Sequence, residues 1–192
     1  MPVDKTQASI RAVAFLGAKK WIMTKYGEKI YKEFLSKYPD LAVVIERKGL
    51  LPVSWLPMKD FNVLANAIIE FFGQGGTANF QEMCKWVAGD ALSTTLKVFM
   101  KLGTPSFIAT AFPGTFAHYF TIGKWTNLLI QSKRVEGELR EDSKDNGPAR
   151  CMATMAWARG ALEYSGAKNL IQLHPECIFK GGSRCYFVYT WD

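Results

Sequence analysis

Three cysteines and one histidine near the C-terminus have the residue types and spacing of a metal site. His174 and Cys177 are three positions apart, and Cys185 follows eight positions later, after a loop with two adjacent glycines. Cys151, at the start of the preceding helical segment, can supply a fourth ligand. Three thiolates and one imidazole form a closed tetrahedral set that suits zinc. The spacing therefore predicts a structural Zn²⁺ ion with no open position for catalysis.

Other interpretations of the same residues stay open. Cys151 can be a small apolar helix residue, and His174 can be a surface histidine in a turn. Cys177 and Cys185 can be ordinary strand or loop residues, or they can form a disulfide. A chain without a secretory signal keeps its thiols reduced, which disfavours the disulfide. Cys84 stands apart in an apolar helical pattern, so we expect a core residue there.

Periodicity and the positions of Gly and Pro predict the elements that hold these residues. Apolar residues at helical spacing predict helices over 5–16, 19–37, 41–47, 58–72, 79–102 and 106–120. After residue 123 the pattern predicts strands over 125–140 with a turn at 132–134, a helix over 149–164, and strands over 168–173 and 184–191. The predicted class is α+β, with N-terminal and central helices packed on a C-terminal antiparallel sheet and one helix inserted between the strand pairs.

The net charge of +7 is concentrated at the front of the chain. Residues 1–50 hold ten Lys or Arg against five Asp or Glu, a balance of +5. The segment 19–37 interleaves lysines with an apolar stripe formed by Trp21, Ile22, Ile30 and Phe34. No nucleic-acid-binding motif follows it, which favours a solvated amphipathic helix over nucleic-acid contact. We expect 1–50 to be a helical extension that forms a homodimer, and 51–192 to be a ligand-binding α+β domain.

The last part of the chain carries a set of short motifs: Gly160-Ala-Leu-Glu-Tyr-Ser-Gly166, His174-x-x-Cys177, Gly181-Gly182, Cys185-Tyr-Phe-Val and Trp191. Over residues 147–192 they resemble the C-terminal signature of the vinyl reductase domain family, and before residue 147 the resemblance is only general. The resemblance implies a small-molecule-binding domain related in fold to TRAPP-type trafficking subunits and to the aromatic-sensing domains of phenol- and xylene-responsive activators.

In those aromatic sensors a helix cysteine, an acidic residue and two cysteines eight positions apart hold a structural zinc. The matching positions here are Cys151, His174, Cys177 and Cys185. The spacings agree, and His174 stands where the sensors carry a carboxylate. Imidazole is also a good zinc ligand, so the resemblance strengthens the zinc prediction.

The resemblance also implies a ligand pocket between the central helices and the sheet. The candidate ligand-binding residues there are Trp86, Phe99, Phe112, Phe116, His118, Tyr119 and Trp125. A mostly apolar cavity suits a hydrophobic or aromatic ligand. Aromatic residues at helical spacing are more typical of a packed core than of a cavity. His118 is either a satisfied core histidine or a hydrogen-bonding partner for a ligand hydroxyl or carboxylate.

The predicted function is a small-molecule-binding sensor or carrier domain for a hydrophobic or aromatic ligand. The alternative is a dimeric scaffold or trafficking-type subunit with no free ligand. A haem-based sensor with His118 as axial ligand is less favoured, because the chain lacks the Tyr-x-Ser-x-Arg signature of haem nitric-oxide domains. A tetrapyrrole vinyl reductase accessory protein is a further alternative. An enzyme is not predicted, because the chain has no Gly-x-Ser-x-Gly elbow, dinucleotide fingerprint or evident acid/base pair.

Targeting signals are absent from the sequence patterns. The first residues, MPVDKTQ, contain no apolar signal-peptide region, and glycines, prolines and a histidine interrupt the weakly charged stretch 102–122. We therefore expect a cytoplasmic protein without a membrane span, which acts alone or with a separate signalling partner.

Overall fold

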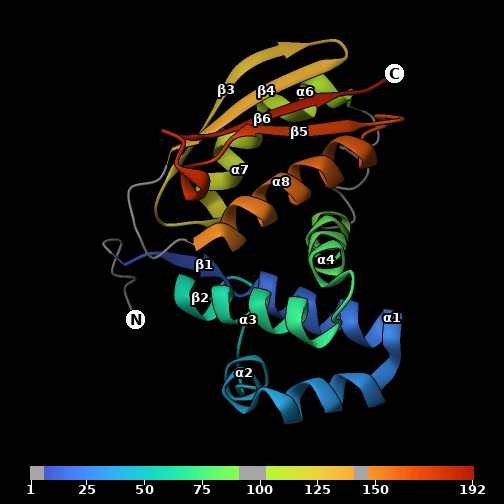
Figure 1. Cartoon of the computed structure of the whole chain (residues 1–192), viewed down its shortest axis with the longest axis vertical. Coiled ribbons are helices and arrows are strands. Elements are labelled where there is room, and N and C mark those ends of the chain that lie inside the picture. The colour runs from blue at the N-terminus through green and yellow to red at the C-terminus, as the bar shows by residue number, and fades with distance from the viewer. Residues whose placement is uncertain (1–6, 91–102, 141–146) are drawn as a thin grey trace.

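A four-stranded antiparallel sheet forms one side of the molecule, and helices cover one of its faces (Figure 1). The computed structural model describes residues 7–90, 103–140 and 147–192. In spatial order the strands are β3 (Lys124–Gln131), β4 (Arg134–Arg140), β6 (Cys185–Thr190) and β5 (Ile171–Glu176). Val135 pairs with Tyr189 and Leu139 with Cys185 on the covered face, and all four are buried. Alternation along the strands places this row against the helices.

Helix α8 (Gly147–Tyr164) lies between the sheet and the N-terminal helices (Figure 1). Cys151 and Met155 belong to the core cluster under the sheet, whereas Ala153 and Ala156 belong to the N-terminal core cluster. The Tyr189 hydroxyl donates a hydrogen bond to the Met155 carbonyl at 3.2 Å. One helix therefore contributes to both cores, which explains why it is buried on nearly all sides.

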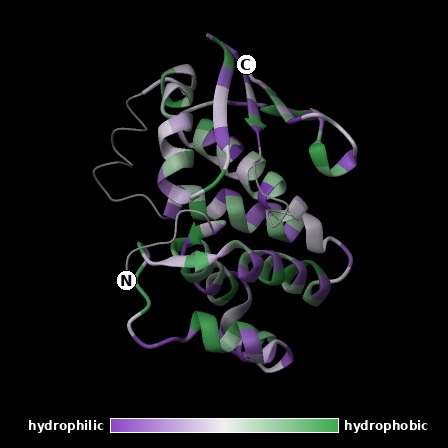
Figure 2. Ribbon diagram, turned by 90° about the vertical axis from the view of Figure 1, so that its left-hand side faces the viewer, coloured by the Kyte–Doolittle hydropathy of each residue, from purple (hydrophilic) through white to green (hydrophobic). Residues whose placement is uncertain are grey.

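The other helices are α1 (Val13–Lys37), α2 (Pro39–Ile45), α3 (Met58–Phe71), α4 (Gly76–Asp90), α6 (Pro105–Thr110) and α7 (Phe112–Tyr119), with a 3-10 turn η2 (Ile178–Lys180). Figure 2 shows hydrophilic and hydrophobic residues interspersed along their ribbons, as amphipathic helices require. Thr104 caps α6 by accepting a hydrogen bond from the Phe107 N–H, and Pro105 occupies the first turn. The predicted α+β class, with its C-terminal antiparallel sheet, is confirmed.

Two predicted helices differ from the structure, and a third is described only in part. Within the predicted helix 5–16, residues Ser9–Arg11 form strand β1, which pairs with β2 (Trp55–Pro57). Local pattern could not show this, because the pairing partner lies about 45 residues away. The predicted helix 106–120 is two helices, α6 and α7, broken beside Pro113, which lacks a backbone N–H. The described part of helix α4 ends at Asp90. The remainder of the predicted helix 79–102, residues 91–102, lies outside the described residues.

The N-terminal helix α1 packs within the chain. The helix is kinked at Gly27, whose φ of +86° is easily adopted by glycine. Trp21, Ile22 and Phe34 are buried in the same cluster as residues of α3 and α4. The stripe that motivated the homodimer is therefore largely used inside the molecule. The dimer and the division at residue 50 stay predictions.

The lysines of α1 are mostly paired with acidic residues of other elements. The ion pairs are Lys19–Glu46, Lys20–Asp90, Lys25–Glu82 and Lys37–Glu70. This pairing agrees with the interpretation of a solvated helix face. No helix in the described residues is long and apolar enough to cross a membrane.

Candidate functional site

An apolar cavity of about 80 Å³ lies between the layers of the fold. Its walls come from β1, α1, α3, α4, α7, α8 and β3. The lining residues are Ile10, Val13, Ala14, Phe61, Met83, Cys84, Val87, Phe112, Thr115, Phe116, Tyr119, Phe120, Trp125, Ala153, Thr154, Trp157 and Ala158. None of these side chains carries a charge. An ionised ligand would therefore lose its hydration without gaining a counter-charge from the described wall.

Helical spacing explains how α7 and α8 build two of the walls. Helix α7 contributes Phe112, Thr115, Phe116 and Tyr119, which recur every three or four residues along one face. Helix α8 contributes residues 153, 154, 157 and 158 in the same way. Trp125 of β3 stacks on Phe187 of β6 and forms the wall of the cavity on the side of the sheet.

Thr154 is a cavity-lining residue whose hydroxyl is itself buried in the packing. Its side chain is 6% exposed, and its Oγ1 has no hydrogen-bond partner among the described residues. Thr115 differs, because its hydroxyl donates to the Ala111 carbonyl at 2.9 Å. A buried hydroxyl without a partner costs about 1–3 kcal/mol. The Tyr119 side chain also lines the cavity, and burial raises the pKa of its hydroxyl, so it stays neutral at physiological pH.

The structure separates the predicted ligand-binding residues into three groups. Phe112, Phe116, Tyr119 and Trp125 line the cavity. Trp86 lies instead on an open groove between α4 and α8, and Phe99 lies outside the described residues.

His118 does not line the cavity, contrary to the expectation that it contacts a ligand there. It follows the cavity-facing Phe116 by two positions, and two helix positions turn a side chain to another face. Its side chain is exposed, and its backbone carbonyl accepts a hydrogen bond from Arg11 Nε at 3.2 Å.

The four predicted metal ligands converge at a second place, between α8 and the β5–β6 hairpin. Cys151 Sγ lies 3.4 Å from His174 Nε2 and 4.0 Å from Cys177 Sγ, and Cys185 Sγ lies 3.9 Å from Cys177 Sγ. The four potential ligand atoms lie within 4.8 Å of one another. All three cysteines are free thiols, so the disulfide alternative does not agree with the structure. The role of these residues as metal ligands stays a prediction.

Ionisation of the three thiols is linked because they share hydrogen bonds. A hydrogen bond from Cys151, together with one from His174, lowers the pKa of Cys185. The same contact with Cys185 and burial raise the pKa of Cys151, and burial raises that of Cys177. The three thiols therefore titrate as a coupled group, in which one negative charge disfavours a second.

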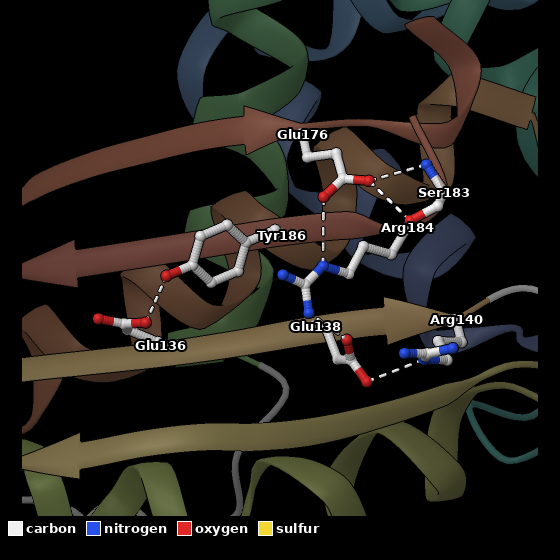
Figure 3. Close-up of polar contacts among 7 residues, drawn as sticks. All are labelled: Glu136, Glu138, Arg140, Glu176, Ser183, Arg184 and Tyr186. Atoms are coloured by element: carbon white, nitrogen blue, oxygen red, sulfur yellow. Dashed lines mark hydrogen bonds and ion pairs between the residues drawn. The ribbon is translucent and has the colours of Figure 1, made fainter. Parts of the chain in front are cut away.

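A polar network on the other face of the sheet holds the loop between β5 and β6 (Figure 3). Glu176 accepts hydrogen bonds from the backbone N–H and the hydroxyl of Ser183, at 2.7 and 2.9 Å. Arg184 bridges Glu176 at 3.2 Å and Glu138 of β4 at 2.7 Å. Because Glu176 and Arg184 directly precede two of the clustered cysteines, this network positions both ends of the loop. These residues were not predicted from the sequence, although their charges alternate on strand positions that face away from the helices.

The chain resembles known sensor folds in structure but not in sequence. No family model and no curated protein matches the sequence. An H-NOX protein from Shewanella oneidensis in the Fe(II)NO ligation state is similar, with a TM-score of 0.71 and 12% identity over 95% of this chain and 99% of that chain. A second solved structure, described as modulating haem redox potential through protein-induced porphyrin distortion, is also similar. Its TM-score is 0.65 and its identity 10%, over 95% of this chain and 100% of that chain.

The phenol-responsive sensory domain of the transcription activator PoxR, solved with phenol, is similar over 71% of this chain and 75% of that chain. Its TM-score is 0.52 and its identity 15%. At these identities the similarities show the fold alone. It is a fold that a small-molecule-responsive sensory domain also has, and the vinyl reductase family stays a resemblance.

The comparisons correct the predicted cofactor. The similar H-NOX structures are described by iron(II) ligation and by haem, not by a structural zinc ion. The prediction of zinc as the cofactor is therefore wrong. The sequence suggested it because three thiols and an imidazole have ligand spacing, but spacing establishes only that the four side chains can meet.

The described cavity does not fit a haem either. The chain has two histidines, and neither lines the cavity: His118 is exposed and His174 lies in the cysteine cluster. Burial raises the pKa of the Cys84 thiol and the Tyr119 hydroxyl, so neither is the anionic ligand that haem iron prefers from Cys or Tyr. The volume of 80 Å³ is also far below the roughly 300–1,000 Å³ of pockets for drug-sized ligands. What these comparisons show of the chain is its fold.

Proposed function

We propose that this chain is a small-molecule-binding sensor domain, and that its ligand occupies the cavity between α4, α7 and α8. The observation that carries the proposal is the cavity itself, whose described walls are apolar. The fold similarity to the phenol-responsive domain of PoxR supports it. Transmission to a separate partner, pairing into a homodimer and a cytoplasmic location belong to the proposal.

The cavity volume limits the size of the ligand. In another protein an engineered apolar cavity of about 150 Å³ binds benzene. The 80 Å³ here holds a ligand of a few heavy atoms, and a single aromatic ring after a wall side chain turns. Trp157 and Tyr119 are partly exposed, so they have room to turn. A lipid chain is too large for this volume.

Binding of toluene and phenol, measured by calorimetry and by amide chemical-shift changes, tests the proposal. Ala158 lines the cavity and is 1% exposed, so Ala158→Val fills part of the space and should weaken binding of both compounds at least tenfold. Ala161 is equally buried on the same helix but does not line the cavity, so Ala161→Val is the matched control. Absence of binding to the wild type, or equal binding to both variants, would contradict the proposal.

A haem-based sensor is the second candidate, because an H-NOX protein matches 95% of this chain in fold. The lack of a histidine at the cavity disfavours it. Adding haemin to the same samples discriminates the two functions. A sharp, stoichiometric Soret band that Ala158→Val removes would favour the haem sensor, and we expect no such band. Organic extraction followed by mass spectrometry would identify a ligand that purifies with the protein.

A further inference from the structure

The loop 47–53, which joins α2 to β2, presents apolar side chains next to cations at the end of the molecule away from the four-stranded sheet (Figure 1). Leu51 and Val53 are each 58% exposed, and Pro52 between them is exposed as well. Arg47 and Lys48 are exposed and form no ion pair within the part of the chain that the structure describes. We propose that the loop 47–53 binds the surface of an anionic lipid bilayer.

The backbone of this loop is fixed, which explains why its apolar side chains point to solvent. The Pro52 carbonyl accepts a hydrogen bond from the Val13 N–H at 3.0 Å, and the Leu51 carbonyl accepts one from the Ser54 N–H at 2.9 Å. Leu50 packs on the N-terminal core cluster, so the side chain that follows it turns outward. The loop is therefore ordered before it meets a bilayer, and binding costs little conformational entropy.

Positive charge predominates around the loop. Arg11 donates hydrogen bonds to two backbone carbonyls, one of them that of Val53, and to no carboxylate among the described residues. Its guanidinium lies 3.8 Å from the centroid of the partly exposed Trp55 ring, and tryptophan is typical of the membrane interface. Glu46, the acid next to the loop, is already paired with Lys19. This excess of cations is complementary to anionic headgroups.

A lipid surface fits the loop better than a second protein does. A stable protein interface buries about 800 Å² on each partner, far more than three apolar residues can offer. A bilayer needs no shape complementarity, because apolar side chains enter the headgroup region while neighbouring cations contact lipid phosphates. The inference does not depend on a ligand in the cavity, so it stands or falls separately from the proposed function.

Cosedimentation of the full chain with vesicles tests the inference. The vesicles contain phosphatidylcholine and phosphatidylserine in equal parts, or phosphatidylcholine alone, and we expect binding to the mixed vesicles only. Arg47→Gln combined with Lys48→Gln should lower the partition coefficient about twentyfold, since each cation near an anionic surface contributes about fivefold. Leu51→Ser combined with Val53→Ser should lower it about tenfold, because the apolar contact with the lipid is lost.

Two double variants on the sheet side are matched controls. Ile171→Ser with Leu173→Ser removes aliphatic side chains that are 60% and 54% exposed on β5. Lys133→Gln with Lys180→Gln removes two exposed cations without an ion pair among the described residues. Charges farther from the bilayer than about 8 Å are screened at physiological salt, so both controls should bind within about twofold of the wild type.

Three results would overturn the inference: no binding of the wild type to the mixed vesicles, equal binding to phosphatidylcholine alone, or an equal loss in a loop variant and its control. If Leu51→Ser with Val53→Ser instead converts a dimer to a monomer in sedimentation without vesicles, the loop is a protein interface and the inference is wrong. Circular dichroism checks the fold of each variant. Leu51→Ala with Val53→Ala replaces the serine pair if that pair unfolds, and the same fall is expected.

Discussion

Two threonines on helices that line the cavity differ in their hydrogen bonding. Thr115 satisfies its hydroxyl within its own helix, whereas Thr154 has no partner among the described residues. The sequence could not distinguish them, since both stand in apolar helical patterns. His118 attracted the ligand hypothesis because histidines are rare in this chain, yet its helix position turns it outward. Rarity of a residue type is thus a weak indicator of a site.

The cysteine cluster was predictable to a different degree. His174, Cys177 and Cys185 lie close in sequence around a glycine turn, so their convergence follows from local geometry. Cys151 joins them only because α8 packs under the hairpin. The spacing could indicate the meeting of these side chains but not a bound ion.

At the same scale, the contribution of Glu138 to stability should depend on pH. Its side chain is 8% exposed, and hydrogen bonds from Arg140 and Arg184 lower its pKa from the ordinary value of 4.5. A carboxyl with a lowered folded-state pKa stabilises the fold above its unfolded value and loses that contribution as pH falls through the folded value. Glu138→Gln should therefore reduce the free energy of unfolding by about 1–2 kcal/mol at pH 7, and by much less near pH 2.

Urea denaturation at both pH values measures this difference. Glu28→Gln is the control, because Glu28 forms an exposed pair with Lys32 one helical turn away. We expect little change in that variant at either pH. An equal loss of stability for Glu138→Gln at pH 7 and pH 2 would show that the charge of Glu138 is not the cause.

At the scale of elements, the crossing of α4 and α8 depends on a missing side chain. A Cβ atom at Gly160 would lie 2.7 Å from the Lys85 carbonyl oxygen and 3.2 Å from the Ala88 Cβ. The close approach of the two helices therefore requires glycine at this position. The same crossing sets the distance between two walls of the cavity, since Cys84 and Ala158 lie on these helices.

We expect Gly160→Ala to lower the free energy of unfolding by about 1–3 kcal/mol, because the backbone of α4 must move. Gly114→Ala is the matched control, because a Cβ there meets no described atom within 4 Å and its backbone is helical. That change should be neutral or raise stability by up to about 1 kcal/mol. Thermal and urea denaturation measure both, and equal stability of the two variants would contradict the packing argument.

Helices and strands were predicted correctly where the sequence pattern was long. The prediction failed where the secondary structure depends on pairing with a distant strand. The helix over 58–72 and the strands around 125–140 have clear periodicity and turn residues, and the structure has α3, β3 and β4 there. Strand β1 is three residues long and pairs with residues 55–57, which no local window contains. A helical pattern over 5–16 was therefore misleading at its start and correct at its end, where α1 begins.

At the scale of the whole molecule, the first fifty residues contribute to the main core. Phe15, Trp21, Ile22 and Phe34 pack in one cluster with residues of α3, α4 and α8. We therefore expect a fragment of residues 51–192 to be largely unfolded, because it would expose the opposite side of that cluster. Circular dichroism and amide proton dispersion, compared with the full chain, measure this. A folded fragment would support the division at residue 50 that composition indicated.

The cavity lies where the two core clusters meet, and this position makes the fold sensitive to hydrostatic pressure. A void of 80 Å³ corresponds to about 50 mL per mole, which lies within the usual range for volume changes on unfolding. Unfolding removes the void, so compression favours the unfolded chain by the work done on that volume. A molecule that fills the space cancels this work. A bound ligand and pressure therefore have opposite effects on the packing of α8 against its neighbours: the ligand stabilises it and pressure weakens it.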